Sequence, residues 1–413
     1  MEKTPKSLRL QLAICGRINA GKSTLLNLIS GQSSAITSPE RGTTTDVVEK
    51  VMELRPLGAA VLLDTAGVDD DSILGASRFQ KTSSAIDRAD AVILVLSPGC
   101  WDEAEKTVLK MAQERKTPIL PVINFHQHKA DDDFADAVKE STGTAPLQVN
   151  AANPECRDEF LGKFTSALLE LLPESRIESV FLRDLLPDDA LVVLMTPIDS
   201  QAPKGRLIMP EVMAIRDALD GNAAVVVAKE NSFPEIYGKL NAKPSLAVCD
   251  SQVVHRMIET TPAEIPLTTF SVLMSRMKGD VEFFAEGCAA IAGLRPGSRV
   301  LIAEACTHHA ADNDIGKKQI PALLENRCGG KLDFTFSAGA DFPEDMAAFD
   351  LVVHCGGCML NRKAMLNRLH KAAAAGVPVT NYGMCISFCR GVIERVLSPF
   401  PQALERYLSK LDN

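Results

Sequence analysis

The N-terminal part of the chain alternates short apolar runs with amphipathic stretches. The apolar runs have the length of buried strands and are Leu10–Cys15, Ala59–Leu63, Ala91–Leu96, Pro118–Ile123 and Leu147–Val149. The amphipathic stretches have helical spacing and are Lys22–Ser30, Glu103–Arg115 and Asp158–Leu171. Strands that alternate with helices of this length predict crossover units on a mostly parallel sheet. Val47–Leu54 precedes the turn Arg55-Pro56-Leu57-Gly58, which predicts an antiparallel hairpin at the sheet edge.

Two shorter series of such elements follow. The middle series has apolar runs at Ala190–Met195, Ala223–Ala228 and Leu246–Cys249 and a helical stretch at Pro210–Leu219. The last series has strand patterns at Arg299–Ala303, Asp350–His354 and Val377–Asn381 and helical patterns at Ile315–Asn326 and Arg362–Ala375. Proline-punctuated linkers at Leu172–Ser175 and Thr260–Pro266 separate the series. We therefore predict an α/β fold of three domains, at residues 1–173, 174–262 and 263–413.

Composition narrows the class of protein. The chain has 413 residues, of which 46% are hydrophobic and 23% charged, as in globular proteins with full-sized cores. Its formal net charge of −9 argues against a broad nucleic-acid-binding face. No apolar run approaches the roughly 18 residues of a membrane span, and the segment Met1–Lys6 has no signal-peptide pattern. We expect a cytoplasmic protein with neither a nucleic-acid nor a membrane partner, whose 11 cysteines are available for metal ligation rather than for disulfides.

A phosphate-binding motif follows the first predicted strand. The residues Gly16-Arg17-Ile18-Asn19-Ala20-Gly21-Lys22-Ser23 fit the pattern G-x-x-x-x-G-K-[ST] between a strand and a helix. Consecutive backbone N–H groups and the helix N-terminus would cradle the phosphates. Lys22 would reach the β and γ phosphates, and the Ser23 hydroxyl would bind Mg²⁺. The predicted nucleotide-binding residues are Gly16, Asn19, Ala20, Gly21, Lys22, Ser23, Thr24 and Asn124.

Further motifs occur in the order of a Ras-like GTPase. Asp64-Thr65-Ala66-Gly67 ends an apolar strand, so Asp64 would hold Mg²⁺ and the Gly67 amide would sense the γ-phosphate. Thr44, in the stretch 41–46, occupies the place of the first switch threonine and would give Mg²⁺ a second hydroxyl. We predict a GTPase with Lys22, Thr44, Asp64 and Gly67 as catalytic residues.

Two details resemble one branch of these enzymes. Val68 stands where many GTPases have a water-orienting glutamine. Asn19 lies in the P-loop, and a Gly-Thr-Thr-x-Asp switch follows it along the chain. This combination resembles the tRNA-modification and ribosome-assembly GTPases that use potassium in place of an arginine finger. The resemblance implies that Asn19 helps to bind K⁺ and that hydrolysis is slow and activated by the cation.

The guanine-reading motif departs from the usual Asn-Lys-x-Asp. The chain has Asn124-Phe125-His126-Gln127, which keeps only the asparagine. The shifted stretch His128-Lys129-Ala130-Asp131 keeps the lysine and the aspartate but loses the asparagine. The later Ser-Ala-Lys element reads Asn150-Ala151-Ala152. The sequence thus predicts phosphate binding and leaves open the choice between guanine and adenine.

Cysteines and histidines follow two predicted strands of the last domain. Cys306-Thr307-His308 follows one strand, and His354-Cys355-Gly356-Gly357-Cys358 ends the other. Parallel strands that end side by side would bring the three thiols to one edge of the sheet. Three thiolates suit an iron–sulfur cluster or zinc, whereas Cys355 and Cys358 alone could form a redox pair. A helix that starts near residue 361 is expected to lower the pKa of Cys358.

The remaining histidines and cysteines have two interpretations each. His308 and His354 are candidates for a further metal ligand, or else an exposed loop residue and a buried strand-end residue respectively. Cys385 and Cys389 are four residues apart, which places them on one face of a helix, and packed thiols are the favoured interpretation.

The combination of these motifs resembles the HydF family of FeFe-hydrogenase maturation GTPases over essentially the whole chain. The resemblance implies a GTPase domain, a middle dimerisation domain and a C-terminal domain with a 4Fe–4S cluster on Cys306, Cys355 and Cys358. It also implies a homodimeric scaffold that carries a diiron subcluster, made with two radical-SAM maturases, to apo FeFe-hydrogenase. In this view GTP hydrolysis modulates partner interactions or release.

Two other functions fit parts of the sequence. One is a potassium-dependent GTPase in tRNA modification or ribosome assembly, with a C-terminal domain stabilised by zinc. The other is a redox enzyme in which Cys355 and Cys358 cycle as a dithiol. The sequence leaves open the fourth iron ligand, the dimer geometry and the way in which the nucleotide state reaches the cluster.

Overall fold

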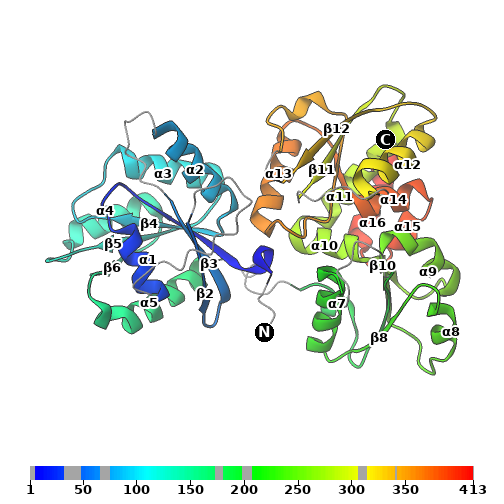
Figure 1. The fold of residues 1–413 in the computed structure, drawn as a ribbon, viewed down its shortest axis with the longest axis horizontal. Coiled ribbons are helices and arrows are strands. Elements are labelled where there is room, and N and C mark those ends of the chain that lie inside the picture. The colour runs from blue at the N-terminus through cyan, green and yellow to red at the C-terminus, as the bar shows by residue number, and fades with distance from the viewer. Residues whose placement is uncertain are drawn as a thin grey trace. The chain divides into compact units, whose positions relative to one another are not determined.

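A computed structural model describes residues 5–31, 48–65, 75–172, 180–197, 207–305, 314–339 and 342–412. The chain divides into two compact units, Met1–Glu178 and Ser179–Asn413. The first unit runs from blue to cyan-green in Figure 1, and the second from green to red. Each unit is built on parallel β-sheets covered by helices, which confirms the predicted α/β fold class.

The first unit contains a six-stranded sheet in the order β2-β3-β1-β4-β5-β6. The strands are β1 (Leu10–Cys15), β2 (Val48–Leu54), β3 (Gly58–Asp64), β4 (Ala91–Leu96), β5 (Ile119–Asn124) and β6 (Leu147–Val149). The edge strand β2 pairs with β3 in an antiparallel hairpin, and the other strands are parallel. Both the predicted parallel sheet and the predicted edge hairpin are confirmed.

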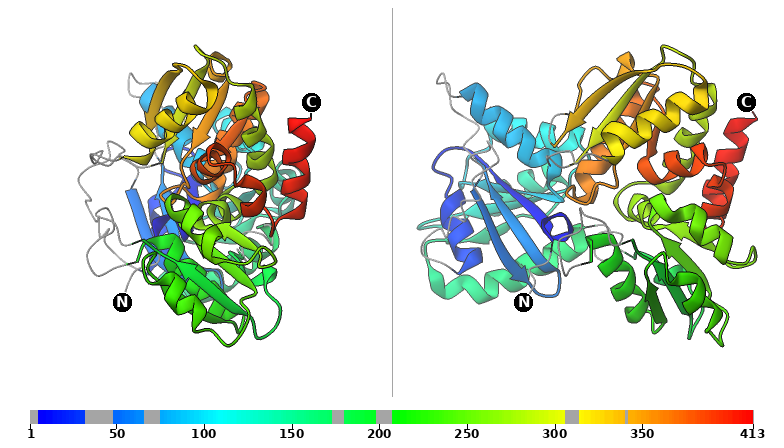
Figure 2. Two further views of the ribbon diagram at one scale, coloured as in Figure 1. Left: turned by 90° about the vertical axis from the view of Figure 1, so that its right-hand side faces the viewer. Right: turned by 45° about the vertical axis from the view of Figure 1, so that its right-hand side comes forward.

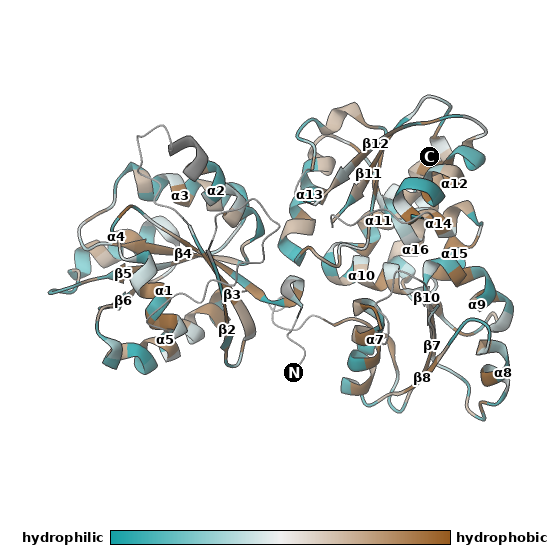
Figure 3. Ribbon diagram, in the orientation of Figure 1, coloured by the Kyte–Doolittle hydropathy of each residue, from teal (hydrophilic) through white to brown (hydrophobic). Residues whose placement is uncertain are grey.

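Helices cover both faces of this sheet. They are α1 (Lys22–Ser30), α2 (Gly75–Arg88), α3 (Glu103–Glu114), α4 (Asp132–Thr142) and α5 (Arg157–Leu171). Leu12 and Ile14 pack with apolar residues of α1 and α5, whereas Ala13 and Cys15 pack with those of α2 and α3. This alternation gives two buried layers, which Figure 1 shows on opposite sides of the sheet. The central strands are accordingly brown in the hydropathy colouring of Figure 3.

The second unit begins with a four-stranded parallel sheet in the order β10-β9-β7-β8. Its strands are β7 (Leu191–Met195), β8 (Ala224–Ala228), β9 (Leu246–Cys249) and β10 (Leu267–Thr269). The helices among them are the 3₁₀ turn η3 (Arg183–Leu185), α7 (Met209–Asp220), α8 (Phe233–Gly238) and α9 (Val254–Thr260). Strand β10 lies beyond the expected boundary at residue 262 and still pairs with β9, so this sheet extends past that boundary.

A second four-stranded parallel sheet follows in the order β12-β11-β13-β14. Its strands are β11 (Arg299–Glu304), β12 (Asp333–Ala338), β13 (Leu351–His354) and β14 (Val379–Asn381). The helices are α10 (Phe270–Lys278), α11 (Val281–Ala289), α12 (Ile320–Cys328), α13 (Arg362–Ala374), α14 (Tyr382–Cys389), α15 (Ile393–Val396) and α16 (Pro401–Leu411). Helix α16 packs along α11, as the views in Figure 2 show. The predicted helix at residues 315–326 begins with a π-helical turn, Ile315–Gln319, before α12.

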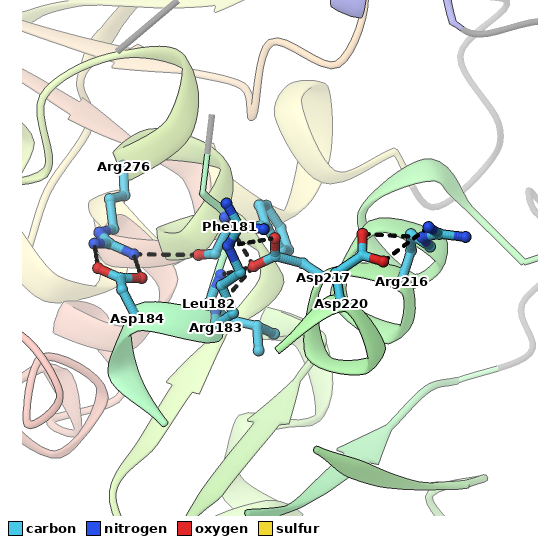
Figure 4. A network of polar contacts seen from close by, with 8 residues as sticks. All are labelled: Phe181, Leu182, Arg183, Asp184, Arg216, Asp217, Asp220 and Arg276. Carbon is cyan, nitrogen blue, oxygen red and sulfur yellow. Dashed lines mark hydrogen bonds and ion pairs between the residues drawn. The ribbon is translucent and has the colours of Figure 1, made fainter. Parts of the chain in front are cut away.

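A polar network joins the two sheets of the second unit (Figure 4). Asp217 of α7 accepts hydrogen bonds through Oδ2 from the consecutive backbone N–H groups of residues 181, 182 and 183. Next along the chain, Asp184 pairs with the guanidinium of Arg276 on α10. Arg276 also donates to the carbonyl of Phe181 at 3.4 Å. The first turn of this unit is thereby fixed to α7 of one sheet and to α10, which packs beside the other.

Candidate functional sites

The P-loop joins β1 to α1 at the carboxyl end of the central strand. Gly16 and Gly21 have backbone φ angles of 149° and 89°, which favour glycine. A Cβ at Gly16 would meet the carbonyl oxygen of Val95, and a Cβ at Gly21 would meet the side-chain amide of Asn124. The two glycines therefore let the loop close tightly between β4 and β5. Ala20 is buried within it, and Thr24 is half-buried in the first turn of α1.

Lys22 lies inside this loop. Its Nζ donates to the carbonyl oxygens of Gly16 at 3.1 Å and of Arg17 at 2.7 Å. The side chain is buried, so its charge is held at the mouth of α1, where the helix N-terminus already favours anions. This arrangement suits a phosphate group that replaces the two carbonyl contacts.

Two of the predicted magnesium ligands lie together. Ser23 Oγ donates to Asp64 Oδ2 at 3.2 Å. Burial raises the pKa of Asp64, while the Ser23 hydroxyl, Lys22 and Lys50 act in the opposite direction. The other two predicted switch residues, Thr44 and Gly67, lie outside the described residues.

An ion-pair clamp holds the P-loop from α3, and the sequence analysis did not identify it. Arg17 donates to both carboxylate oxygens of Glu105, from Nε and from one terminal nitrogen, each at 2.7 Å. The same terminal nitrogen of Arg17 lies 2.8 Å from Asp102. Glu105 is 1% exposed and also accepts from the backbone N–H of Asp102, which is the helix N-cap. The Asp-x-x-Glu spacing of Asp102 and Glu105 is the pattern of a helix capping box, and it was the one feature of the sequence that could have indicated the position of these carboxylates.

The side chain of Asn124 bridges two loops of the nucleotide site. Its Nδ2 donates to the carbonyl of Ala20 at 3.1 Å, and its Oδ1 accepts from the N–H of Ala151 at 3.0 Å. Asn124 is 3% exposed, so it acts as a fixed strut between the P-loop and the loop after β6. Asn19, the predicted potassium ligand, has φ 62° and an exposed side chain at the surface of the P-loop.

The thiol site lies at the carboxyl ends of β11 and β13. These strands are neighbours in the sheet although β12 comes between them in the chain, which makes their shared end a topological switch point. Cys355 donates its backbone N–H to Ala303 O at 2.9 Å. Its Sγ accepts from the N–H groups of Ala305 at 3.1 Å and Gly357 at 3.4 Å. Two backbone donors therefore hold this sulfur at the end of the sheet.

Cys358 is half-buried and lies in the turn between β13 and α13. The helix begins near residue 361, as the sequence predicted, and Asn361 caps it by accepting from the N–H of Ala364. The expected lowering of the Cys358 pKa is wrong, because burial raises it, and the nearby charge of Lys278 offsets that effect only in part. Lys278 is 1% exposed, and its Nζ donates to Leu360 O at 2.8 Å, which holds a cation beneath the thiol loop.

His354 is fully buried at the end of β13. Its Nδ1 contacts Cys355 O at 2.7 Å, and its Nε2 contacts Arg368 at 3.1 Å. Burial, together with the guanidinium of Arg368, lowers the pKa of His354 to about 4. The imidazole is therefore neutral at physiological pH, and metal binding would require one of its two contacts to break.

Within the described ranges of the chain, no group of three or more Cys, His, Asp and Glu side chains is arranged to hold a metal ion. Cys306 and His308 lie outside those ranges, so of the predicted donors the structure describes His354, Cys355 and Cys358, which lie at and just after the end of β13. Cys385 and Cys389 both lie on α14, as expected. A hydrogen bond from Cys385 lowers the pKa of Cys389, and the pKa of the fully buried Cys385 is raised.

Three family profiles match consecutive parts of the chain. A profile described as "50S ribosome-binding GTPase" matches residues 11–125. A profile described as "Hydrogen maturase F dimerization domain" matches residues 181–279, and one described as "Hydrogen maturase F tetramerization domain" matches residues 282–399. The first segment is therefore a P-loop GTPase domain. The sequence analysis did not anticipate a match to a tetramerization profile.

Individual relatives match the GTPase domain. The "tRNA modification GTPase MnmE" of Synechococcus sp. is 41% identical over 28% of this chain and 25% of its own length. The "GTPase Der" of Prochlorococcus marinus is 35% identical over 33% of this chain and 29% of its own length. This chain thus spans less than a third of the length of either relative. The solved structure of the G domain of the T. maritima FeoB iron transporter matches at 20% identity and a TM-score of 0.30, over 38% of this chain and 98% of its own.

None of the helices in the described segments is both long and apolar enough to cross a membrane.

Proposed function

The chain belongs to the HydF family of hydrogenase maturases, and we propose that it is a GTP-hydrolysing scaffold. In this role it carries the diiron subcluster precursor and delivers it to an apo FeFe-hydrogenase. The observation that carries the proposal is the occurrence, in one chain, of a formed P-loop and of a thiol pair at a sheet switch point.

The hydrolytic part of the proposal assigns a role to each P-loop side chain. Lys22 exchanges its two carbonyl contacts for the β and γ phosphates of GTP. Ser23 Oγ and Asp64 Oδ2, which already lie 3.2 Å apart, would hold Mg²⁺, which would supply positive charge against the phosphates. Thr44 would add a second hydroxyl, and the Gly67 amide would respond to the γ-phosphate.

Asn19 would hold K⁺ beside the phosphates. Its exposed amide projects from a P-loop residue, where a monovalent cation can stabilise the negative charge that develops during hydrolysis. Because Arg17 is committed to Glu105 and Asp102, we do not assign it the role of an arginine finger. The proposal predicts slow hydrolysis that K⁺ accelerates.

The thiol residues fit an iron–sulfur cluster by their chemistry. Cys355 and Cys358 are partly exposed at one sheet edge, and Cys355 Sγ already accepts two backbone N–H groups. The N–H of Ala305 that reaches this sulfur belongs to the residue before Cys306. We propose that these three cysteines hold a 4Fe–4S cluster with one exchangeable iron site, and that His308 is a candidate ligand there. We leave His354 out of the ligand set because both ring nitrogens are engaged.

Partners follow from the same proposal. The names of the two hydrogen maturase profiles support an oligomer built through residues 181–399. A homodimer is the simplest assembly consistent with the dimerization profile. Apo FeFe-hydrogenase and two radical-SAM maturases are the proposed exchange partners. We propose that this exchange takes place in the cytoplasm.

A second candidate is a potassium-dependent GTPase in tRNA modification or ribosome assembly, with zinc bound by the C-terminal cysteines. The identity of the N-terminal domain to "tRNA modification GTPase MnmE" and "GTPase Der" favours it. The formal net charge of −9 favours the scaffold over an RNA-binding role.

Metal analysis separates the two candidates. The full chain would be purified anaerobically, reconstituted with iron and sulfide, and examined for metal content and for an EPR signal after reduction. The scaffold proposal predicts about four irons per chain and a reduced-cluster signal that Cys306→Ala removes. One zinc per chain with no signal would contradict the scaffold and support the second candidate.

A further inference from the structure

The loop after β5 keeps the framework of a base-binding loop. Asn124 ties it to the P-loop through Ala20 and to the loop after β6 through Ala151. The next residue, Phe125, donates its backbone N–H to Val149 O at 2.9 Å. Asn150 closes the framework by donating its side-chain amide to the carbonyl of His126 at 3.2 Å. The two loops that would flank a purine are therefore bound to each other and to the phosphate site.

The carboxylate of a guanine-reading loop is missing from this framework. Gln127 occupies the third position after Asn124, and its side chain is exposed. The next carboxylate along the chain is Asp131, whose Oδ1 accepts from the N–H of Phe134 at 2.8 Å as the N-cap of α4. Asp131 is therefore committed to the helix start, and an amide is the polar group that this loop offers to a base.

An amide and a carboxylate complement different purines. Guanine presents two neighbouring donors, its N1–H and its 2-amino group, and a carboxylate accepts both. The side-chain amide of Gln127 has one acceptor and one donor, so it can pair with only one of them. Hypoxanthine keeps N1–H and lacks the 2-amino group, and xanthine has an oxygen acceptor in its place. Gln127 thus pairs with hypoxanthine as well as with guanine and complements both positions of xanthine.

Phe125 changes the second contact with the base. It stands where the usual motif has a lysine and is half-buried in the loop that Asn124 anchors. An aromatic ring stacks on any purine, because every base has a π-face. Stacking on Phe125 would therefore contribute affinity for any purine base, without distinguishing the hydrogen-bonding groups at the edge of the base.

We propose that Gln127 and Phe125 make this site unselective for the 2-amino group of guanine nucleotides. GDP and IDP should then bind with affinities within a few-fold of each other, and XDP should bind at least as tightly as either. This inference rests on the proposed nucleotide-binding function and deepens it by naming the substrate class.

The test measures the dissociation constants of GDP, IDP and XDP for the full-length protein with Mg²⁺ by isothermal titration calorimetry. Diphosphates avoid hydrolysis during the titration. The expected result for the wild type is a GDP-to-IDP affinity ratio within about 5-fold, because the carboxylate contact that would separate the two is lacking. Phe125→Ala should weaken all three nucleotides by a similar factor of about 5-fold or more.

Gln127→Asp restores the missing carboxylate at an exposed position, so the fold should be retained. It should raise the preference for GDP over IDP and XDP by about 10-fold to 100-fold, the range expected for a charge-assisted contact. His126→Asp is the matched control, since it adds the same charge at the neighbouring exposed residue and should leave the preference unchanged.

Three outcomes would overturn the inference. A wild-type preference for GDP over IDP well above 10-fold would show that another group reads position 2. An unchanged preference in Gln127→Asp would show that residue 127 does not face the base. In both cases nucleotide binding, and with it the proposed function, would stand. Failure of the wild type to bind any of the three nucleotides would instead overturn the proposed GTPase role, and the inference with it.

Discussion

The phosphate site of the first unit and the thiol site of the second lie at equivalent places in their sheets. Each is at the carboxyl end of a central parallel strand, where the chain reverses its direction across the sheet. They differ in how their residues are brought together. The P-loop is eight consecutive residues, Gly16–Ser23, and Lys22 bonds within that stretch. The thiol site joins residues from strands about 50 positions apart.

Strand register is what assembles the thiol site. Ala303 of β11 lies opposite His354 of β13, so the residues that follow the two strands meet. The N–H of Ala305 then reaches Cys355 Sγ at 3.1 Å. A local motif forms its own site through backbone dipoles, whereas a thiol site of this kind depends on the whole sheet. Variants in the two regions should therefore fail in different ways.

The largest effect should come from Lys22→Ala. Removing the ammonium that we propose contacts the transferred phosphate should lower GTP hydrolysis by at least about 100-fold, measured as phosphate release. The iron content of the reconstituted protein should stay unchanged. Lys106→Ala, at an exposed lysine of α3, is the matched control and should behave as the wild type. A loss of both GTP hydrolysis and iron in Lys22→Ala would contradict the idea that the two sites form independently.

Cys355→Ala should give the reverse pattern. It removes the sulfur that accepts two backbone N–H groups, so we expect loss of most of the iron while GTP hydrolysis stays within about 2-fold. Cys328→Ala, at a half-buried cysteine of α12, should retain the iron. Full cluster content in Cys355→Ala would show that the ligand assignment is wrong.

A smaller effect is expected from the clamp between Arg17 and Glu105. Glu105→Gln keeps the shape but removes a buried charge that Arg17 contacts twice, so the first unit should lose about 1–3 kcal/mol of unfolding free energy. Urea unfolding followed by the fluorescence of Trp101, the one tryptophan of the chain, measures this directly. Glu103→Gln, at an exposed carboxylate of the same helix, should change little, and equal losses in the two variants would argue against the clamp.

The smallest effect concerns the Asp184–Arg276 ion pair of the second unit. Arg276 holds the pKa of Asp184 below its usual value, so the stability it provides is present above the unfolded pKa of about 3.9 and is lost as pH falls below it. Because both side chains are partly exposed, Asp184→Asn should cost less than about 1 kcal/mol at pH 7 and less still at pH 3. Urea unfolding followed by circular dichroism at the two pH values tests this. Asp220→Asn, which breaks the exposed pair with Arg216, is the control and should show a smaller change; a cost at pH 3 equal to that at pH 7 would contradict the ion-pair explanation.

Apolar patterning predicted most strands and missed a consistent set of elements. Strands β1, β4, β6 and β9 match the expected bounds, because each is a short apolar run buried in a sheet. Strand β12 was missed since it lies at a sheet edge and is half exposed, and β10 was missed because it has three residues directly after a proline-rich linker. Helix α14 was indicated only by the four-residue spacing of Cys385 and Cys389, because it is buried on nearly all sides and lacks the amphipathic period that marks a surface helix.

The sequence by itself determined the parts that depend on neighbouring residues. Glycines at 16 and 21 with a lysine and a serine after them specify a phosphate cradle wherever a strand leads into a helix. Tertiary packing decided which residues, distant in the sequence, contact the P-loop and how deeply the thiols are buried. The closure of Arg17 onto Glu105, the two bonds of Asn124 and the burial that raises the pKa of Cys358 follow from register and desolvation. Hydrogen-bond partners and burial are set only when the sheets assemble, because the type of a residue does not determine which distant residue it contacts or how exposed it is.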